Sequence, residues 1–372
     1  MKTRRVLIAP DKFKGTLTAE AAADAIAAGW RRACPDDTLT LAPISDGGDG
    51  FGAILGRAHA ATAHEVETVD AAGRTVRATW WLGADGETAV VESANVIGLA
   101  MLPRAQFHPF ELDTFGLGQV LQAAAAAGAK RCFAGIGGSA TNDGGFGMAR
   151  ALGWRFQRRD GSEIIRWTDL TELVEARPPR PLRPFRQLTV AVDVQNKLLG
   201  KLGCSRVYGP QKGLREADFP AAESALGRLA RVMAKRRGGD LAKEPGAGAA
   251  GGLGFGLCAF AGARMRPGFA LVSRALRLPQ KIRQADLVVT GEGMLDRSTA
   301  MGKGTGELAV LCAELGRPCV GLGGQVRDLP ALRGRFATCR ALSELTTPEN
   351  AMQDPARWLA TLAESVAGRT KA

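Results

Sequence analysis

Short apolar runs that lead directly into glycine-rich polar turns recur along this chain, and they constrain its fold more than any other feature. Continuous apolar runs of this length are typical of strands buried on both faces of a parallel sheet. Six such runs occupy residues 6–9, 39–42, 131–134, 188–191, 286–289 and 319–322.

Helical stretches alternate with these strands. Thr18 is predicted to cap an Ala-rich helix that runs to about residue 32. Further helices are predicted over residues 115–127, 307–315 and 358–366. This alternation indicates a doubly wound α/β architecture with a mostly parallel sheet. Ligands bind outside the carboxyl ends of the strands in such sheets, so the six polar turns are expected to surround one site.

Two segments depart from the pattern. Residues 65–93 read as three alternating strands separated by short turns that contain Gly73 and Gly86, which predicts an inserted antiparallel element. The proline-rich run at residues 177–186 fits neither a helix nor a central strand. We interpret this run as an extended basic connector.

Length and composition place the chain among globular proteins of about two domains. It has 372 residues, of which 45% are hydrophobic and 23% charged. No apolar run approaches the ~20 residues that cross a bilayer, and the apolar run at the N-terminus is too short for a signal peptide. Seven scattered cysteines without a Cys-x-x-Cys pair argue against a disulfide framework or a zinc site. A cytoplasmic protein is expected.

The net charge of +12 leaves three interpretations open. Arginine supplies 37 of the 49 basic residues, which is consistent with a compositional habit of the source. The charge also suits an anionic small substrate or a nucleic acid. Aromatic residues make up 6% of the chain, so platforms for stacking bases are sparse.

The polar turns combine acidic residues, lysines and many glycines. Glycine lets backbone N–H groups approach anionic oxygens, lysine supplies a positive charge, and carboxylates hold Mg²⁺ or accept a hydroxyl proton. Phosphoryl transfer needs this combination. Only three histidines are present, so a Ser-His-Asp hydrolase fits badly.

Two dinucleotide-like fingerprints keep an NAD-dependent oxidoreductase open as an alternative. Residues 135–140 fit G-x-G-x-x-A after a strand, but the polar residues that follow delay any helix. Residues 246–251 fit G-x-G-x-x-G without a preceding strand. Gly254 and Gly256 are interpreted as packing residues, whereas Gly251 and Gly252 could either pack or bind phosphate.

Taken in order, the loops resemble the bacterial glycerate kinase family over nearly the whole chain. The resemblance rests on Ala-Pro-Asp-Lys-Phe-Lys-Gly at 9–15, Ser-Asp-Gly-Gly-Asp-Gly at 45–50, Gly-Ile-Gly-Gly-Ser-Ala-Thr-Asn-Asp-Gly-Gly at 135–145, Asp-Val-Gln-Asn at 193–196, Tyr-Gly-Pro-Gln-Lys-Gly at 208–213, Gly-Ala-Gly-Ala-Ala-Gly-Gly-Leu-Gly at 246–254, Gly-Glu-Gly-Met-Leu-Asp at 291–296 and Gly-Lys at 302–303.

This resemblance implies a kinase that uses ATP and Mg²⁺ to phosphorylate D-glycerate, most often at the 2-hydroxyl. It also implies two domains with a cleft between them: a Rossmann-like α/β domain of residues 1–64 and 285–372, and an inserted mixed domain of residues 65–284. The expected partner is a small hydroxyacid substrate, and neither a nucleic acid nor a membrane is expected as a partner. Whether the protein forms a homodimer is left open.

The candidate site residues follow from the resemblance and from their places after strands. Lys14, Asp193 and Asp296 are the expected catalytic residues, and Asp46, Asp193 and Asp296 are the expected metal ligands. Residues expected to contact substrate or phosphate are Asp11, Lys12, Gly137, Gly138, Ser139, Asn142, Lys212, Gly291, Glu292, Gly293 and Lys303.

Overall fold

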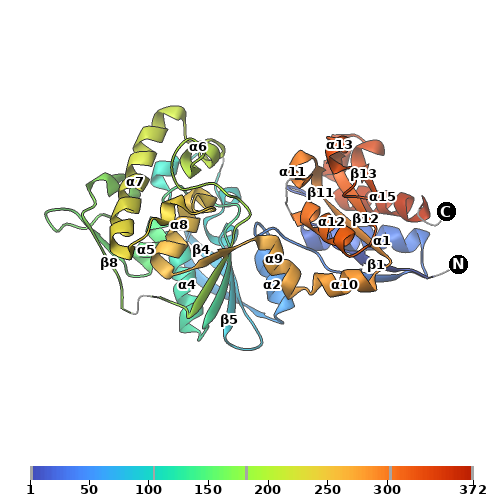
Figure 1. The fold of residues 1–372 in the computed structure, drawn as a ribbon, viewed down its shortest axis with the longest axis horizontal. Helices are drawn as coiled ribbons and strands as arrows, with labels where there is room; N and C mark the ends of the chain where they lie inside the picture. Colours follow the sequence, from blue (N-terminus) through green and yellow to red (C-terminus); the bar gives the residue numbers. More distant parts are fainter. Residues whose placement is uncertain (1–2, 104, 181–182, 301–303, 370–372) are drawn as a thin grey trace. The chain divides into compact units, whose positions relative to one another are not determined.

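The computed structural model describes residues 3–103, 105–180, 183–300 and 304–369 (Figure 1). The chain forms two compact units. The first unit comprises Met1–Asp46 and Gly268–Ala372, and the second comprises Gly47–Pro267.

The boundaries of these units differ from the expected domain boundaries. Strand β3 (Thr62–Val69) pairs along its whole length with β4 (Thr75–Leu82), so residues 62–64 belong to the sheet of the second unit. Helices α9 (Gly268–Ala275) and α10 (Leu278–Gln284) contact α12 (Gly304–Glu314) and β1 (Arg5–Ile8), respectively, and belong to the first unit.

The first unit is built on a five-stranded sheet in the order β13-β12-β11-β1-β2, with every pair parallel. Its other strands are β2 (Thr38–Leu41), β11 (Leu287–Leu295), β12 (Cys319–Val326) and β13 (Thr338–Ala341). Its other helices are α1 (Ala19–Ala33), α11 (Arg297–Ala300), α13 (Leu329–Leu332), α14 (Pro348–Gln353) and α15 (Pro355–Arg369).

Helices cover both faces of this sheet. Val6 and Ile8 of β1 join a buried cluster with Ile26 of α1 and Leu362 of α15, while Leu7 between them is also buried. Because successive side chains of a strand point to opposite faces, β1 is buried on both sides. This confirms the doubly wound arrangement.

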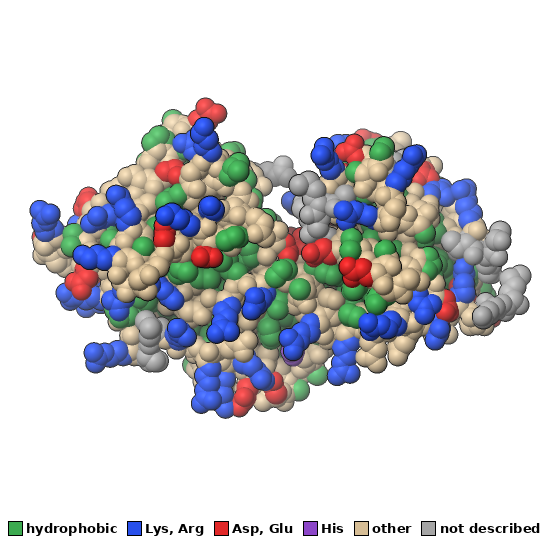
Figure 2. Space-filling model, in the orientation of Figure 1, with side chains coloured by type: hydrophobic (Ala, Val, Ile, Leu, Met, Phe, Trp, Pro, Cys, Tyr) green, Lys and Arg blue, Asp and Glu red, His purple; other side chains and the backbone are tan. Residues whose placement is uncertain are grey.

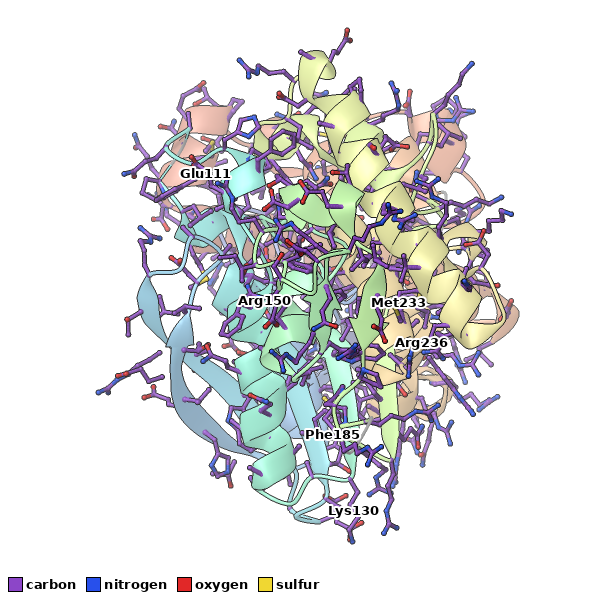
Figure 3. All side chains as sticks on the ribbon, turned by 90° about the vertical axis from the view of Figure 1, so that its left-hand side faces the viewer. Glu111, Lys130, Arg150, Phe185, Met233 and Arg236 are labelled. Atoms are coloured by element: carbon purple, nitrogen blue, oxygen red, sulfur yellow. The ribbon has the colours of Figure 1, made fainter. Side chains whose placement is uncertain are left out.

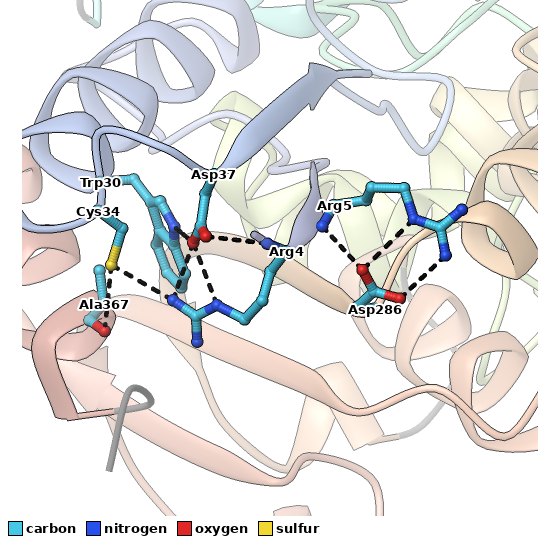
Figure 4. Close-up of polar contacts among 7 residues, drawn as sticks. All are labelled: Arg4, Arg5, Trp30, Cys34, Asp37, Asp286 and Ala367. Atoms are coloured by element: carbon cyan, nitrogen blue, oxygen red, sulfur yellow. Dashed lines mark hydrogen bonds and ion pairs between the residues drawn. The ribbon is translucent and has the colours of Figure 1, made fainter. Parts of the chain in front are cut away.

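Local hydrogen bonds fix the ends of these elements as the sequence predicts. Thr18 caps α1, since its hydroxyl accepts from the backbone N–H of Ala21 at 3.1 Å. The Asp37 carboxylate accepts hydrogen bonds from Arg4 Nη2 at 2.8 Å and from Trp30 Nε1 at 2.9 Å (Figure 4). These bonds tie the start of β1 to the end of α1.

The second unit contains a six-stranded mixed sheet in the order β10-β9-β6-β5-β4-β3 and a two-stranded sheet, β7-β8. Its other strands are β5 (Thr88–Glu92), β6 (Arg131–Gly135), β7 (Arg155–Gln157), β8 (Glu175–Arg177), β9 (Gln187–Ala191) and β10 (Arg264–Arg266). Its helices are α2 (Phe51–Ala58), α3 (Ala94–Ile97), α4 (Phe115–Ala126), α5 (Phe146–Ala151), α6 (Cys204–Tyr208), α7 (Phe219–Arg237) and α8 (Ala249–Ala261).

The predicted antiparallel element is confirmed as β3, β4 and β5. The turns that join these strands contain Gly73 and Gly86 with φ of +78° and +67°, where glycine avoids a steric cost. The remaining strands of this sheet, β5, β6, β9 and β10, are parallel to one another.

Helix α7 shows how the second unit combines core packing with surface charge (Figure 3). Met233 is buried in the core, and the guanidinium of Arg236 lies 5.6 Å from the centre of the Trp154 ring. At the basic end of the helix, Arg237 Nη1 donates to the carbonyl oxygens of Cys258 and Ala259 at 2.9 and 2.7 Å. The basic end of α7 therefore binds the last turn of α8.

The predicted strands at 131–134 and 188–191 lie in the second unit's sheet, within the range that the resemblance assigns to the inserted domain. One sequence-based expectation needs correction. The stretch 290–295 is not a turn but the second half of β11. Gly291 and Gly293 allow this pairing, since a Cβ at Gly291 would lie 2.3 Å from the carbonyl oxygen of Leu322 on β12.

In the parts of the chain that the structure describes, no helix is both long and apolar enough to span a bilayer.

Candidate active site

In the first unit, four carboxylates gather where β1, β2 and β11 meet the start of α12. Asp11 follows β1, and its backbone N–H donates to the Gly291 carbonyl of β11 at 2.8 Å. A Cβ on Gly304, the first residue of α12, would lie 3.3 Å from Asp11 Oδ2. Asp46, Glu292 and Glu307 belong to the cluster through their charges, as the pKa values below show.

Burial and mutual repulsion disfavour the charged forms of this cluster. Burial, the Asp46 charge and, to a smaller extent, Glu292 raise the pKa of Asp11 to about 7, although Lys12 counteracts them. Burial and Asp46 also raise the pKa of Glu307. Such a group of carboxylates gains stability when a cation or a proton arrives.

Three other predicted residues of the first unit are described by the structure, and a fourth is not. Glu292 accepts a hydrogen bond from Thr299 Oγ1 at 2.8 Å, and Asp296 Oδ1 accepts from the backbone N–H and hydroxyl of Ser298 at 2.7 and 2.6 Å. Lys14 is exposed at the tip of the turn after Phe13. Lys303 lies outside the described residues.

In the second unit, two polar loops leave neighbouring strand ends. Gly135 of β6 and Ala191 of β9 are paired in the sheet register. The loop that carries Ser139 and Asn142 therefore begins beside the loop that carries Asp193. Parallel strands bring their carboxyl ends to one edge of the sheet, which explains this convergence.

Lys212 is the most unusual side chain of this cluster. It is 7% exposed, and its Nζ donates to Ser139 Oγ at 3.2 Å and to the Thr141 carbonyl at 2.7 Å. Both partners are neutral. Burial lowers the pKa of Lys212 to about 8, although Cys204 and Asp143 partly offset this effect. A buried ammonium group held by neutral partners is suited to receive an anion.

Asn142 and Thr141 bring buried oxygens without hydrogen-bond partners to the same loop. Asn142 Nδ2 donates to Ser205 Oγ at 2.9 Å. Within the described residues, Asn142 Oδ1 and Thr141 Oγ1 have no hydrogen-bond partner, although both atoms are buried. Buried polar atoms are rarely left unpaired, so these oxygens are candidates for contact with a ligand.

Asp143, in contrast, has a structural role. Its buried carboxylate accepts hydrogen bonds from the backbone N–H and the hydroxyl of Thr114, at 3.0 and 2.8 Å. It also accepts hydrogen bonds from the backbone N–H groups of Gly145 and Gly147, at 3.1 and 2.9 Å. Burial nevertheless raises the pKa of Asp143. These bonds fix the loop to the starts of α4 and α5.

The glycines of these loops serve close packing. The Gly137 N–H donates to the Gly47 carbonyl at 3.2 Å, and the Gly138 carbonyl accepts from Leu99. A Cβ at Gly251, where φ is +68°, would lie 2.0 Å from the Thr141 carbonyl oxygen. Gly252 and Gly256 also lie against the 141–145 loop. Gly251 and Gly252, left open by the sequence, therefore pack, as Gly256 does.

The dinucleotide fingerprints lack the geometry that a dehydrogenase needs. After β6, ten residues precede the first residue of α5, whereas the dinucleotide fold starts its helix within the fingerprint. A short 3₁₀ turn (Leu241–Lys243), not a strand, lies ahead of residues 246–251.

The first-unit cluster suits Mg²⁺ held jointly with phosphate oxygens. Among residues 3–103, 105–180, 183–300 and 304–369, no three His, Cys, Asp or Glu side chains form a metal-binding group. Mg²⁺ commonly uses one or two carboxylates together with waters and substrate phosphates. Thr305 Oγ1 and Glu307 Oε2 are buried and have no hydrogen-bond partner in the described chain, which leaves oxygen ligands available beside Asp46.

Sequence reasoning missed some polar groups of both clusters. Glu307 and Thr305 read only as the start of a helix, and Thr141 and Ser205 carry no motif signal of their own. An acidic residue in the first turn of a helix is ordinarily a stabilising feature. Its burial and its repulsion with Asp46, which follow from the fold, distinguish Glu307.

Comparisons with known proteins agree with this arrangement. The model of the glycerate kinase family matches residues 6–371. The chain is 38% identical to the glycerate kinase of Halalkalibacterium halodurans over 86% of this chain and 85% of that protein. It is 37% identical to the glycerate 2-kinase of Escherichia coli K12, over 87% and 86%.

A solved structure extends the similarity to the fold. A crystal structure from Salmonella typhimurium LT2, provisionally named glycerate kinase 2, aligns with a TM-score of 0.84 at 34% identity. The alignment covers 100% of this chain and 99% of that one. The chain belongs to the glycerate kinase family.

Proposed function

We propose that this protein transfers the γ-phosphoryl group of ATP to the 2-hydroxyl of D-glycerate and releases ADP and 2-phosphoglycerate. The observation that carries this proposal is the buried Lys212 ammonium group, held by neutral partners in a chain of the glycerate kinase family. The name of the Escherichia coli relative supports position 2.

The second unit supplies the glycerate site. Lys212 binds the carboxylate of glycerate, because a buried ammonium group and the Ser139 hydroxyl together offer donors to two oxygens. Asn142 Oδ1 accepts from a substrate hydroxyl, since this buried oxygen has no partner in the described structure. Gly137 and Gly138 line the same loop.

Asp193 acts as the general base. It follows β9 beside the strand that leads to Ser139 and Asn142. The 2-hydroxyl oxygen attacks the γ-phosphorus, the bond from this phosphorus to the β–γ bridging oxygen breaks, and the hydroxyl proton passes to the Asp193 carboxylate. Asp296 suits this role less well because its Oδ1 already accepts from Ser298.

The first unit supplies the nucleotide phosphate site. Asp46 and Asp296 are the proposed ligands of Mg²⁺, with Asp11, Glu292 and Glu307 around them. When bound, Mg²⁺ neutralises the charge on the transferred phosphoryl group. Lys12, Lys14 and Lys303 add positive charge near the phosphates, and Gly291 and Gly293 keep the strand edge free of side chains.

A reducing, cytoplasmic setting suits the cysteines. All seven are free thiols, and burial raises the pKa of Cys132 and Cys258. Buried thiols with a raised pKa react slowly, so the fold needs no disulfide.

The test measures ADP release from MgATP by the purified protein with and without D-glycerate, followed by phosphorus NMR of the product. We expect glycerate-dependent turnover and a 2-phosphoglycerate signal. A 3-phosphoglycerate signal would overturn the proposed position. Turnover with another small hydroxyacid, but none with glycerate, would overturn the substrate and keep the phosphoryl transfer.

A further inference from the structure

A cavity of about 280 Å³ opens beside β1 and β2, wholly within the first unit. The register pairs Arg5 with Thr38 and Leu7 with Thr40, so these four side chains share one face of the sheet. Helix α10 covers this face with Lys281 and Gln284, which lie three residues apart and therefore on the same side of the helix.

The polar groups of the cavity are hydrogen-bond donors that the fold does not use. Lys281 is half-buried, whereas Thr38 and Thr40 on the edge strand and Gln284 on α10 are exposed, so the cavity opens to solvent. Within the described part of the chain, the side chains of these three residues and of Gln284 make no hydrogen bond or ion pair. The cavity thus offers one ammonium group, two hydroxyls and one amide to a ligand.

The local charge is positive. Arg5 pairs with Asp286, with Nη2 and Oδ1 3.0 Å apart (Figure 4). Arg283, on the same helix as Lys281, accepts a hydrogen bond at its carbonyl from Arg317 Nη2 at 2.8 Å. Burial lowers the pKa of Lys281, and among the residues that the structure describes no carboxylate counteracts this effect. The charge of Lys281 is therefore left for a ligand to neutralise.

We propose that this cavity is a second anion site that binds a phosphate group, either free or carried by a small molecule. A phosphate presents three strong acceptor oxygens and nearly two negative charges, which match the ammonium, hydroxyl and amide donors. The volume is below the usual range of about 300–1,000 Å³ for sites of larger ligands, so the site takes a compact molecule. Leu7 and Ala285 form an apolar part of the cavity wall, which can contact a few carbon atoms of the ligand.

This site is separate from the candidate active site. Its lining on these strands ends at Leu7 and Thr40, whereas Asp11 and Asp46 come after the carboxyl ends of β1 and β2 and do not line it. The inference therefore goes beyond the proposed function and does not depend on it.

The experiment is an NMR titration of the ¹⁵N-labelled full chain at constant ionic strength, with inorganic phosphate in one arm and 2-phosphoglycerate in the other. Backbone amides of Thr38, Thr40 and Ala285 report on the cavity, and those of Gly138 and Ser139 report on the active site. We expect saturable shifts of the cavity amides with at least one probe. Tighter binding of inorganic phosphate identifies the free ion, and tighter binding of 2-phosphoglycerate identifies a phosphate monoester.

Variants localise the binding. Lys281→Met should raise the apparent Kd at the cavity amides about tenfold or more, without changing the shifts at Gly138 and Ser139. Lys281→Arg should keep the binding. Arg283→Met, which removes an equal charge from the same helix outside the cavity lining, is the matched control. Thermal unfolding checks that each variant is folded.

Two results overturn the proposal. One is a set of shifts that grow without saturation for both probes, which is the signature of general ion screening. The other is an equal Kd in the wild-type protein and in Lys281→Met. Neither result bears on glycerate-dependent ADP release, which tests the proposed function separately.

Discussion

The two units build polar clusters of opposite character from the same plan of strand ends and loops. In the first unit, carboxylates crowd together, and burial raises the pKa of Asp11 to about 7. In the second unit, an ammonium group is buried among neutral oxygens, and burial lowers the pKa of Lys212 to about 8. Both clusters hold charges that the fold alone does not favour, and such groups are candidates for binding a ligand that supplies the balance.

The basic residues on the surface follow another pattern. Figure 2 shows Lys and Arg side chains spread over the visible face instead of gathered into one patch. Several of them pair with acids, as Arg32 does with Glu364 and Arg131 with Asp85. Exposed pairs of this kind contribute little to stability. The dispersed charge gives no support to the nucleic-acid alternative.

The largest expected effect is on turnover and concerns Asp193 of the second unit, whose loop begins beside the loop that carries Ser139 and Asn142. Asp193→Asn should lower kcat by about 10³-fold and leave the protein folded, because the amide cannot take the hydroxyl proton. Steady-state ADP release and circular dichroism measure this. Asp160→Asn, on an exposed turn of the same unit, is the control. Normal turnover in Asp193→Asn would mean that Asp193 is not the general base and that a carboxylate of the first unit takes the proton.

The next prediction tests whether the buried Asp143 carboxylate serves stability. Asp143→Ala leaves the buried donors of Thr114, Gly145 and Gly147 without an acceptor, so we expect unfolding free energy to fall by about 3–4 kcal/mol. Denaturant titration gives this value. A loss below about 1 kcal/mol would mean that water replaces the carboxylate and that the loop is not held as described.

Lys212→Met should lower kcat/KM by about 10²-fold while the melting temperature stays level or rises, because a buried ammonium group costs stability in the absence of a ligand. In the wild-type protein, Lys212 loses its charge as pH rises through about 8, so kcat/KM for glycerate should decline above that pH. Lys212→Arg should remove this decline. Lys235→Met, on the exposed end of α7, controls for charge. A strongly lowered melting temperature in Lys212→Met would mean that Lys212 stabilises the fold and does not serve mainly to bind substrate.

The smallest effect is expected at Asp11. Because its pKa is about 7 in the folded protein and 3.8 ordinarily, the folded state binds more protons between these values, and stability falls as pH rises from about 4 to about 7. Asp11→Asn should flatten this slope and stabilise the protein at pH 8 by on the order of 2 kcal/mol. Unfolding at a series of pH values measures the slope. An unchanged slope would show that Asp11 is not the group that titrates.

Local signals in the sequence predicted most elements of the fold. Apolar runs marked β1, β2, β6 and β9 to within a residue, and Thr18 marked the start of α1. These features depend on neighbours in the chain. Membership in a sheet depends on pairing between distant segments, so local signals do not give the strand order of the two sheets.

The site could be predicted only in part for the same reason. Motifs pointed to Ser139, Asn142 and Lys212, and the structure brings these three to one loop cluster. No local pattern indicates that Lys212 is buried with neutral hydrogen-bond partners, since this follows from how residues 209–213 pack against Thr141. The extension of β11 past Gly291 likewise depends on its contact with Leu322.

The first unit takes its strands from both ends of the chain, and this has a consequence for synthesis on the ribosome. Val6 pairs with Leu287, so at roughly 5–20 residues per second β1 waits about 15–60 s for its partner. The intervening 47–267 segment carries its own sheet and core and can fold during this interval. Throughout it, β1 has only β2 to pair with, and its edge that later pairs with β11 stays open to chaperones or to another nascent copy.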